Sequence, residues 1–376
     1  MQTASPALAR LQPPDAIDVA QLRRVLVIKL RHHGDVLLSS PVLAALKAAA
    51  PQAQVDALVY DDTAAMLRGH PALDQLHLLA RNAAHGGALR KFGAELRLLR
   101  ALRARHYDLI VHLTDHPRGA WLVRLLRPRW AVAHEREHGQ WWWRRAFTHL
   151  ARRPRGTPRA TVESHLDLLR RIGIHPRPED RSPTLATAPQ TLESARAKLR
   201  QAGWNGERFA VVHPGSRWLF KAWTVEGNAG VIDHLAARGL AVVLTAAPDP
   251  REARLGDEIL AAAAGTRVID LRGQLSLAEL GAVIRLASCF FGVDSVPMHI
   301  AAAVGTPGVA LFGPSSEAEW GPWSQTLHVV ASQRHSCRPC RIDGCGGSKR
   351  SDCLVTLPLP QVLAALDAAL EQAARD

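Results

Sequence analysis

Runs of apolar residues alternate with amphipathic segments along nearly the whole chain. The first run, Val-Leu-Val-Ile at 25–28, is typical of a β-strand covered on both faces. Gly34 and Asp35 then predict a tight turn that carries one carboxylate. Ser40-Pro41 opens an Ala- and Leu-rich segment to Ala50, since Ser favours the N-cap and Pro the first helical position. Strand, turn and helix form the first unit of a doubly wound α/β domain.

The same succession repeats twice over, on either side of a break. In the first half we expect strands at 55–60, 76–80, 107–113 and 130–133, and helices at 88–105, 119–126 and 161–172. In the second half we expect strands at 209–213, 240–245, 268–271, 289–292 and 309–312, and helices at 224–237, 250–264, from Ser276, from Ser295 and at 359–374. Alternating strands and helices imply parallel sheets.

A polar stretch with three prolines, His175 to Pro183, breaks the pattern and indicates a domain linker. At 376 residues the chain exceeds a usual single core. The sequence therefore predicts the following parts: a loose leader at 1–22, an N-terminal Rossmann-like domain at 23–178, a linker at 179–190, a C-terminal Rossmann-like domain at 191–357 and a C-terminal helix at 358–376.

Charge narrows the possible partners without choosing one. The net charge is +13, which favours nucleic acid, anionic lipid or a phosphorylated substrate. The alternative is that the many arginines reflect a GC-rich coding bias and no particular partner. No run is long enough to span a bilayer, and residues 1–22 lack the apolar core of a secretion signal, so we expect a cytoplasmic protein. Nucleic acid is disfavoured, because no element carries a basic face with a reader motif.

Candidate chemistry falls at the ends of predicted strands, where ligands bind in such folds. Asp35 follows the first strand, although it could merely cap or solvate its loop. In the second half, His213-Pro-Gly-Ser216 offers free backbone N–H groups, and Lys221 adds a positive charge suited to a diphosphate. An ordinary solvated lysine is the alternative.

A second cluster, Gly292-Val-Asp-Ser-Val-Pro-Met-His299, opens a predicted helix. Ser295 can cap this helix, whose N-terminus attracts anions, and Asp294 could hold sugar hydroxyls. His299 lies four residues after Ser295, on the same helix face. A helix-start signal followed by a core histidine remains the alternative. A further Gly- and Ser-rich strand end lies close by, at 305–316.

These motifs resemble those of the ADP-heptose:lipopolysaccharide heptosyltransferases, glycosyltransferase family 9. The resemblance covers residues 24–355, with its marks in the expected order: Gly34-Asp35-Val36-Leu37 and Pro41, His70-Pro71, His213-Pro214-Gly215-Ser216 with Lys221 and Trp223, and Gly292-Val293-Asp294-Ser295 with His299-Ile300-Ala301-Ala302. The His32-His33-Gly34-Asp35 form and Cys337-Arg-Pro-Cys340 are most similar to the branch-adding group of the family.

The resemblance implies a GT-B fold, with two Rossmann-like domains facing a cleft. It implies an inverting transfer of heptose from ADP-L-glycero-D-manno-heptose to the inner core of lipopolysaccharide; another acceptor glycan or protein is the alternative. Asp35 matches the general base of the family. Its donor-binding positions match Ser216, Lys221, Asp294, Ser295 and His299. Val296 departs from the family, which often has Gly there beside the donor.

No cofactor or metal is expected in this reaction. The chain lacks an Asp-x-Asp motif, since Asp61 and Asp62 are adjacent. Lys221 and helix N-termini would then stabilise the departing diphosphate. Base and leaving group fall on different domains, so closure should assemble the site.

The acceptor implied by the resemblance is a phosphorylated lipopolysaccharide core, which basic side chains would bind. We expect two basic segments on loops of the first domain, at 85–91 and 115–118, and the densest aromatic and basic run lies at 139–145. The candidate acceptor-binding residues are Arg90, Lys91, Arg118, Arg144 and Arg145. Trp141–Trp143 could contact the inner membrane, giving a peripheral association with its anionic surface; one of these Trp could instead belong to the core, with the arginines forming a solvated face.

Four cysteines form a compact set near the C-terminus: Cys337, Cys340, Cys345 and Cys353. Four thiolates can hold a structural zinc ion, although this spacing matches no common zinc finger. Loop packing or redox-tolerant thiols are the alternative, and a disulfide is not expected in the cytoplasm. Cys289, within a predicted strand, should simply be buried.

Overall fold

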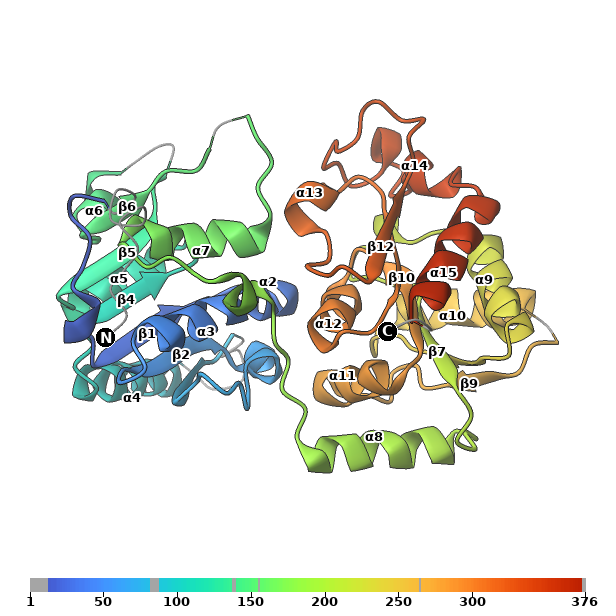
Figure 1. Ribbon diagram of the computed structural model, residues 1–376, viewed down its shortest axis with the longest axis horizontal. Coiled ribbons are helices and arrows are strands. Elements are labelled where there is room, and N and C mark those ends of the chain that lie inside the picture. Colours follow the sequence, from blue (N-terminus) through green and yellow to red (C-terminus); the bar gives the residue numbers. More distant parts are fainter. Residues whose placement is uncertain (1–12, 82–87, 137–139, 155, 264, 374–376) are drawn as a thin grey trace. The chain divides into compact units, whose positions relative to one another are not determined.

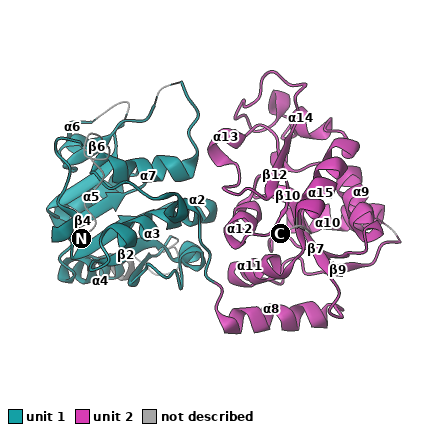
Figure 2. Cartoon of the chain, viewed as in Figure 1, with its two compact units in different colours: residues 1–186 teal, residues 187–376 magenta. Residues whose placement is uncertain are grey.

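The computed structural model describes residues 13–81, 88–136, 140–154, 156–263 and 265–373. The side chains of residues 88–91 and 373 are not described. The chain divides into two compact units, Met1–Ala186 and Thr187–Asp376 (Figure 2). The division falls within the stretch 179–190 that the sequence assigns to a linker.

Unit 1 is built on a six-stranded sheet in which every pair of neighbours is parallel (Figure 1). Its strands are β1 (Arg24–Ile28), β2 (Gln54–Tyr60), β3 (Gln75–Leu79), β4 (Leu109–His112), β5 (Trp130–His134) and β6 (His149–Ala151). Its helices are α2 (His33–Leu37), α3 (Ser40–Ala49), α4 (Ala88–Ala104), α5 (Pro117–Leu126), α6 (Trp141–Arg144) and α7 (Thr161–Arg171), with 3-10 turns η1 (Val19–Gln21), η2 (Asp61–Met66) and η3 (Pro178–Arg181).

Unit 2 repeats this plan, and its strand neighbours are likewise parallel. Its strands are β7 (Phe209–His213), β8 (Ala241–Leu244), β9 (Val268–Asp270), β10 (Cys289–Val293), β11 (Gly308–Phe312) and β12 (Leu327–Ala331). Its helices are α8 (Pro189–Gln201), α9 (Val225–Ala237), α10 (Pro250–Ala262), α11 (Leu277–Leu286), α12 (Val296–Val304), α13 (Glu317–Trp320), α14 (Asp352–Val355) and α15 (Leu359–Ala373), with η4 (Leu219–Lys221) and η5 (Cys345–Gly347).

Strand order reverses once in each sheet, and this positions the site. Unit 1 has the order β3-β2-β1-β4-β5-β6, so the chain crosses from one side of β1 to the other between β3 and β4. Unit 2 has the order β12-β11-β10-β7-β8-β9, so the chain crosses from one side of β7 to the other between β9 and β10. The neighbouring strands at this reversal point are β7 and β10. In such sheets ligands bind beyond the carboxyl ends of the strands at the reversal point. The expected α/β class with two doubly wound sheets is confirmed.

The strands at these reversal points are buried along their length. All five residues of β7 and of β10 are buried, and so are the last four of β1. Burial on both faces explains why these strands have continuous apolar sequences rather than alternating ones. Each sheet thus provides a rigid base for the loops at its carboxyl end.

Several local expectations need correction. Gly34 and Asp35 lie in the short helix α2, not in a tight turn. Ser40 is the first residue of α3 and Ser39 the N-cap; the Ser40 hydroxyl donates instead to the Leu37 carbonyl, at 2.7 Å. Arg118 lies in the first turn of α5, where a loop was expected. Residues 88–91 begin α4, in agreement with the helix expected at 88–105 and not with the loop expected at 85–91.

The N-terminal stretch is attached to unit 1 where it is described. Leu22 is fully buried, and Arg171 of α7 makes two hydrogen bonds of 2.8 Å with the carboxylate of Asp15. Residues 13–22 are therefore not a loose leader, while residues 1–12 lie outside the described residues. Among the helices that the structure describes, none has the length and apolar character needed to cross a membrane.

Candidate active site

Asp35 lies in the first turn of α2, just beyond the carboxyl end of β1. Its side chain is 16% exposed, so solvent or a substrate can still reach it. Its Oδ1 lies 3.5 Å from Nζ of Lys29, the residue that follows β1. The carboxylate is thus held against a buried cation at the reversal point of the sheet.

Lys29 is fixed by three groups from different parts of unit 1. Besides Asp35, its ammonium donates to the Leu113 carbonyl at 3.1 Å, beyond β4, and contacts Nε2 of His165 at 2.9 Å, on α7. Nδ1 of His165 lies 3.0 Å from the Leu38 carbonyl. A carbonyl only accepts, so Nδ1 carries the hydrogen and Nε2 accepts from Lys29. Lys29 therefore bridges the ends of β1 and β4.

The electrostatics of this cluster follow from burial. Desolvation lowers the pKa of Lys29, and the neighbouring carboxylate of Asp35 opposes that shift. Desolvation also holds the pKa of His165 well below its usual value, helped by the charge of Lys29. His165 is therefore neutral and serves as an acceptor. Asp35 is thus the acidic partner of Lys29, and a partly exposed carboxylate can act as a general base.

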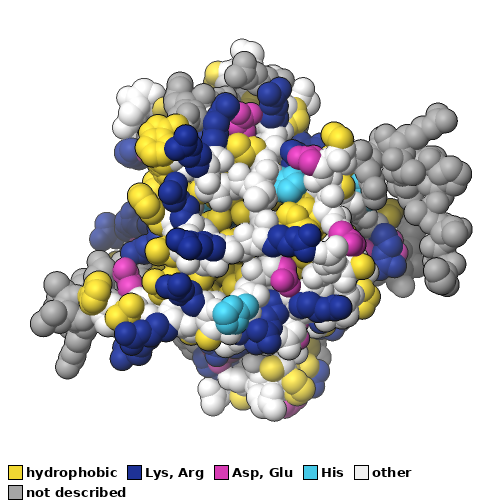
Figure 3. Space-filling model, turned by 90° about the vertical axis from the view of Figure 1, so that its left-hand side faces the viewer, with side chains coloured by type: hydrophobic (Ala, Val, Ile, Leu, Met, Phe, Trp, Pro, Cys, Tyr) yellow, Lys and Arg dark blue, Asp and Glu magenta, His cyan; other side chains and the backbone are white. Residues whose placement is uncertain are grey.

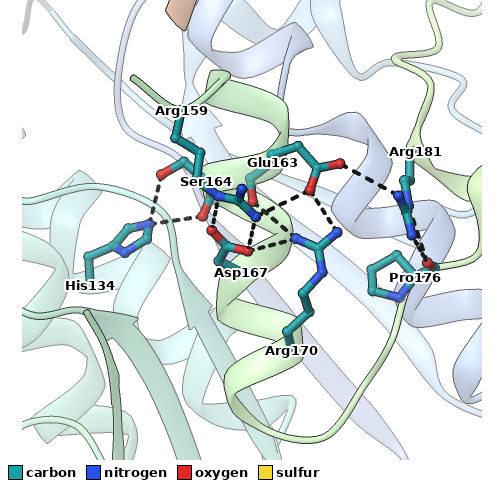
Figure 4. A network of polar contacts seen from close by, with 8 residues as sticks. All are labelled: His134, Arg159, Glu163, Ser164, Asp167, Arg170, Pro176 and Arg181. Carbon is teal, nitrogen blue, oxygen red and sulfur yellow. Dashed lines mark hydrogen bonds and ion pairs between the residues drawn. The ribbon is translucent and has the colours of Figure 1, made fainter. Parts of the chain in front are cut away.

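A polar network surrounds α7, the helix that carries His165 (Figure 4). Arg159 pairs with Asp167, with one contact of 2.6 Å, and Arg170 joins Asp167 to Glu163 with two contacts of 2.7 Å. Nε2 of His134, at the end of β5, lies 3.0 Å from the Ser164 carbonyl. The network connects the segment before α7 to the helix, and the helix to the sheet.

In unit 2, Lys221 and Asp294 form the central contact. Nζ of Lys221 lies 2.5 Å from Oδ2 of Asp294, and both side chains are largely buried. Lys221 ends η4 after β7, while Asp294 directly follows β10. Because β7 and β10 are neighbours at the reversal point, two residues 73 positions apart meet there. The lysine also lies 5.4 Å above the ring of Trp218.

The other donor-binding candidates surround this ion pair. Ser216 is buried, and its hydroxyl accepts from the Trp218 N–H at 3.3 Å. Ser295 occupies the N-cap of α12, yet its hydroxyl donates to the Val293 carbonyl at 3.2 Å instead of capping the helix. Val296, half-buried, begins α12, and His299 is buried one turn further on.

Sequence analysis missed a buried carboxyl group beside the Pro-Gly-Ser turn. Glu252 of α10 accepts from the Ala247 N–H at 3.0 Å, and its Oε2 lies 3.8 Å from Nε2 of His213. Burial raises the pKa of Glu252 and lowers that of His213 to about 4. A Cβ on Gly215 would lie 2.7 Å from Oε2 of Glu252, so the present positions of the turn and the carboxyl group require a glycine there. No sequence motif signalled Glu252.

The basic acceptor candidates are engaged with acidic or aromatic neighbours. Arg118 donates to Glu95 of α4 at 2.7 Å, and Arg144 donates to Glu135 at 2.6 Å. Arg145 lies 5.2 Å from the ring of Trp141. The side chains of Arg90 and Lys91 lie outside the described part of the structure. Whether these residues bind an acceptor stays a prediction.

The tryptophan run divides between core and surface. Trp143 is fully buried, with its indole N–H donating to the His134 carbonyl at 3.1 Å, while Trp141 is exposed.

The four C-terminal cysteines have free thiols, and among the described residues no group of three or more His, Cys, Asp or Glu is arranged to hold a metal ion. Cys289 is buried in β10.

Comparison with known proteins gives one consistent family. A family model described as glycosyltransferase family 9 (heptosyltransferase) matches residues 95–349. Lipopolysaccharide heptosyltransferase 3 of Escherichia coli is 36% identical over 339 residues, covering 90% of this chain and 96% of the relative. The solved family 9 glycosyltransferase of Veillonella parvula superposes with a TM-score of 0.80 at 20% identity, covering 95% of this chain and 99% of that one. The solved ADP-heptose lipopolysaccharide heptosyltransferase II of E. coli has a TM-score of 0.73 at 22% identity, covering 93% and 99%.

Proposed function

Because the chain belongs to glycosyltransferase family 9, we propose that it is a heptosyltransferase of the lipopolysaccharide core that inverts the anomeric centre, with Asp35 as general base. The donor would be ADP-L-glycero-D-manno-heptose, and the acceptor a phosphorylated inner-core sugar. Family membership and the E. coli relative at 36% identity support heptosyl transfer.

The observation that carries the role of Asp35 is its contact with Lys29. A direct displacement needs a base to take the proton of the acceptor hydroxyl as the new glycosidic bond forms. Asp35 lies at the sheet edge where ligands bind, remains partly exposed, and faces a cation 3.5 Å away. The contact with that cation holds the carboxylate in place at the end of β1, where an acceptor hydroxyl would have to lie.

The donor is assigned to unit 2. Lys221 places a positive charge near the end of β7, and the N-terminus of α12 adds backbone N–H groups. These groups suit a diphosphate that gains charge as the bond to the sugar breaks. Ser216, Ser295 and His299 surround the same strand ends, and Asp294 can accept from sugar hydroxyls when Lys221 turns to the diphosphate. The Gly215–Glu252 approach shapes the neighbouring turn.

A second candidate is transfer of the same sugar to a different acceptor glycan or to a protein. Acceptor-binding loops vary most among related transferases, so family membership alone does not fix the acceptor. For either acceptor we expect a cytoplasmic enzyme. For a lipopolysaccharide acceptor we also expect peripheral contact with the anionic surface of the inner membrane.

The test is the variant Asp35→Asn, assayed with ADP-heptose and truncated lipopolysaccharide acceptors. We expect transfer to be lost while titration calorimetry shows unchanged ADP-heptose binding, because only the base is removed. Asp62→Asn is a matched control, since Asp62 follows β2 and pairs with Arg81. Near-normal turnover by Asp35→Asn would contradict the role of the base. Transfer by the wild type to a protein but to no lipopolysaccharide would favour the second candidate.

A further inference from the structure

Four large apolar side chains lie exposed on three helices of unit 1. The exposed fractions are 67% for Phe92 of α4, 58% for Trp121 and 46% for Leu125 of α5, and 66% for Trp141 of α6. Single exposed apolar residues are common, but a group of large ones marks an interaction surface. Below we call these four residues the apolar band.

Contacts link the three helices that carry the band. Trp121 stacks on Trp142, next to Trp141, with ring centroids 6.5 Å apart. On the other side, Arg118 of α5 pairs with Glu95 of α4 at 2.7 Å. Trp121 lies one turn after Arg118, and Phe92 lies one turn before Glu95. Leu125 is a further turn along the Trp121 face of α5.

The segment that carries the band is the most basic part of the chain. Residues 88–153 contain 15 Lys and Arg against 5 Asp and Glu, which is +10 of the net charge of +13. Arginines pair with three of the acids: Arg118 with Glu95, Arg144 with Glu135, and Arg153 with Asp115. Figure 3 shows Lys and Arg side chains spread over one face, with hydrophobic side chains between them and fewer acids. An anionic surface would be complementary to this field.

Cations and rings are interleaved within the band. The guanidinium of Arg124 lies 5.9 Å from the ring of Trp121, and that of Arg145 lies 5.2 Å from the ring of Trp141. Tryptophan prefers the boundary between headgroups and acyl chains, and arginine can extend from there to phosphate. A soluble phosphorylated ligand would need only the arginines. The exposed rings therefore favour a bilayer.

We propose that the apolar band docks unit 1 on an anionic lipid bilayer, with its rings at the headgroup boundary and the neighbouring arginines on lipid phosphates. The inference rests on the proposed function only in that the acceptor is lipid-anchored. It places the membrane contact mainly on α4 and α5, whereas the sequence pointed to Trp141–Trp143. Of those three, Trp143 belongs to the core.

The test is co-sedimentation of the full chain with phosphatidylcholine vesicles, with and without phosphatidylglycerol. We expect binding to the anionic vesicles that weakens as salt rises, since exposed charges are screened over roughly 8–10 Å near physiological ionic strength. The double variant Phe92→Ser/Leu125→Ser should bind at least about tenfold more weakly, the effect of losing about 1.4 kcal/mol. Arg97 is an exposed residue of α4, the helix that carries Phe92. Arg97→Gln/Arg124→Gln should weaken binding and flatten its salt dependence.

Matched controls come from exposed residues of unit 2. Ile342→Ser, at a side chain that is 59% exposed, and Arg200→Gln/Arg254→Gln should leave vesicle binding unchanged. If these controls lost as much vesicle binding as the band variants, binding would depend on the total charge and apolarity of the chain and not on the band. That result would overturn the proposal. So would binding unaffected by the band variants, or light scattering in which those variants dissociate a dimer without changing vesicle binding.

Activity on a water-soluble, deacylated acceptor separates this inference from the proposed function. Phe92→Ser/Leu125→Ser should transfer heptose to that acceptor at the wild-type rate, because neither residue is part of the site. A wild type that binds anionic vesicles but transfers no heptose would contradict the proposed function alone. A variant that loses soluble-acceptor activity together with vesicle binding would contradict a docking role for the band.

Discussion

The ammonium of Lys29 lies 2.9 Å from Nε2 of His165, although the two residues are 136 positions apart. The histidine donates through Nδ1 to the Leu38 carbonyl, so its other nitrogen is available as an acceptor. One neutral side chain thus provides an uncharged acceptor for a buried cation. The charge of that cation is balanced by the neighbouring carboxylate of Asp35, 3.5 Å away.

The first prediction concerns this acceptor. His165→Leu removes the acceptor from a buried ammonium, so we expect a loss of about 1.5–3 kcal/mol in the free energy of unfolding, measured with urea. Transfer should slow at least about tenfold as Lys29 and Asp35 lose their alignment. His165→Asn keeps an oxygen that can accept from Lys29, so this variant should retain more of the stability and more of the transfer rate. Equal losses in the two variants would show that packing alone matters at this position.

The second prediction concerns Lys29 itself. Lys29→Met preserves the length of the side chain and removes the cation beside Asp35, so kcat should fall at least about tenfold, the equivalent of one charge-assisted contact. The KM for ADP-heptose should hold, since the donor is assigned to unit 2. Steady-state kinetics at several pH values measure both quantities. A raised donor KM with an unchanged kcat would remove Lys29 from the catalytic site.

The sequence predicted the strands and their ends well, and the partners of its site residues poorly. The strand expected at 209–213 is β7, because four apolar or aromatic residues precede His213 and Pro214-Gly215 ends the run. The edge strands β6 and β12 were missed, since the three residues of β6 include only one large apolar side chain and His328 interrupts the apolar run of β12. The motif at Asp35 was found from its place after β1.

Lys29 was missed because its importance comes from distant contacts. Locally it is one lysine at the end of a strand, and only the fold brings Leu113 and His165 to it. The same holds for Lys221 and Asp294: each was found singly, but their ion pair follows from the adjacency of β7 and β10. Strand order, which local pattern does not reveal, decides which strand ends share a site.

The third prediction separates the two members of that ion pair. Lys221→Ala removes the cation assigned to the diphosphate, so ADP should bind about tenfold more weakly or worse, for a lost contact of about 1.5–3 kcal/mol. Asp294→Asn should leave ADP affinity nearly unchanged and weaken ADP-heptose, since its carboxylate is assigned to sugar hydroxyls. Calorimetric titration with both ligands measures the difference. Equal effects of Asp294→Asn on the two ligands would rule out a sugar contact.

The fourth prediction uses the close approach of Gly215 to Glu252. An alanine side chain at 215 would lie 2.7 Å from the carboxyl group, so the Glu252 side chain or the turn after β7 must shift. We expect Gly215→Ala to weaken ADP binding severalfold while thermal unfolding confirms a folded protein. Gly93→Ala is the control, because nothing lies within 4 Å of its Cβ position. Unchanged ADP affinity in Gly215→Ala would mean that the turn does not contact the donor.

The last prediction concerns His112, at the end of β4. Its ring is buried against Trp143 and Phe147, and neither ring nitrogen has a hydrogen-bond partner among the described residues. Desolvation lowers its pKa to about 3, from an ordinary value of 6.5. Between those two values the unfolded chain binds a proton that the folded chain excludes, so stability falls as pH decreases from 6.5 towards 3.

Replacing His112 should flatten this dependence. His112→Leu has a similar volume and no titrating nitrogen, so its stability relative to the wild type should rise as the pH falls. At pH 5 the gain is about 2 kcal/mol, because one pKa unit corresponds to about 1.36 kcal/mol. At pH 7.5 the histidine is neutral in the folded and in the unfolded wild type, so the two proteins differ in stability only through packing. Urea unfolding of both proteins at the two pH values measures this gain, and a stability difference that is the same at both would contradict a buried neutral histidine.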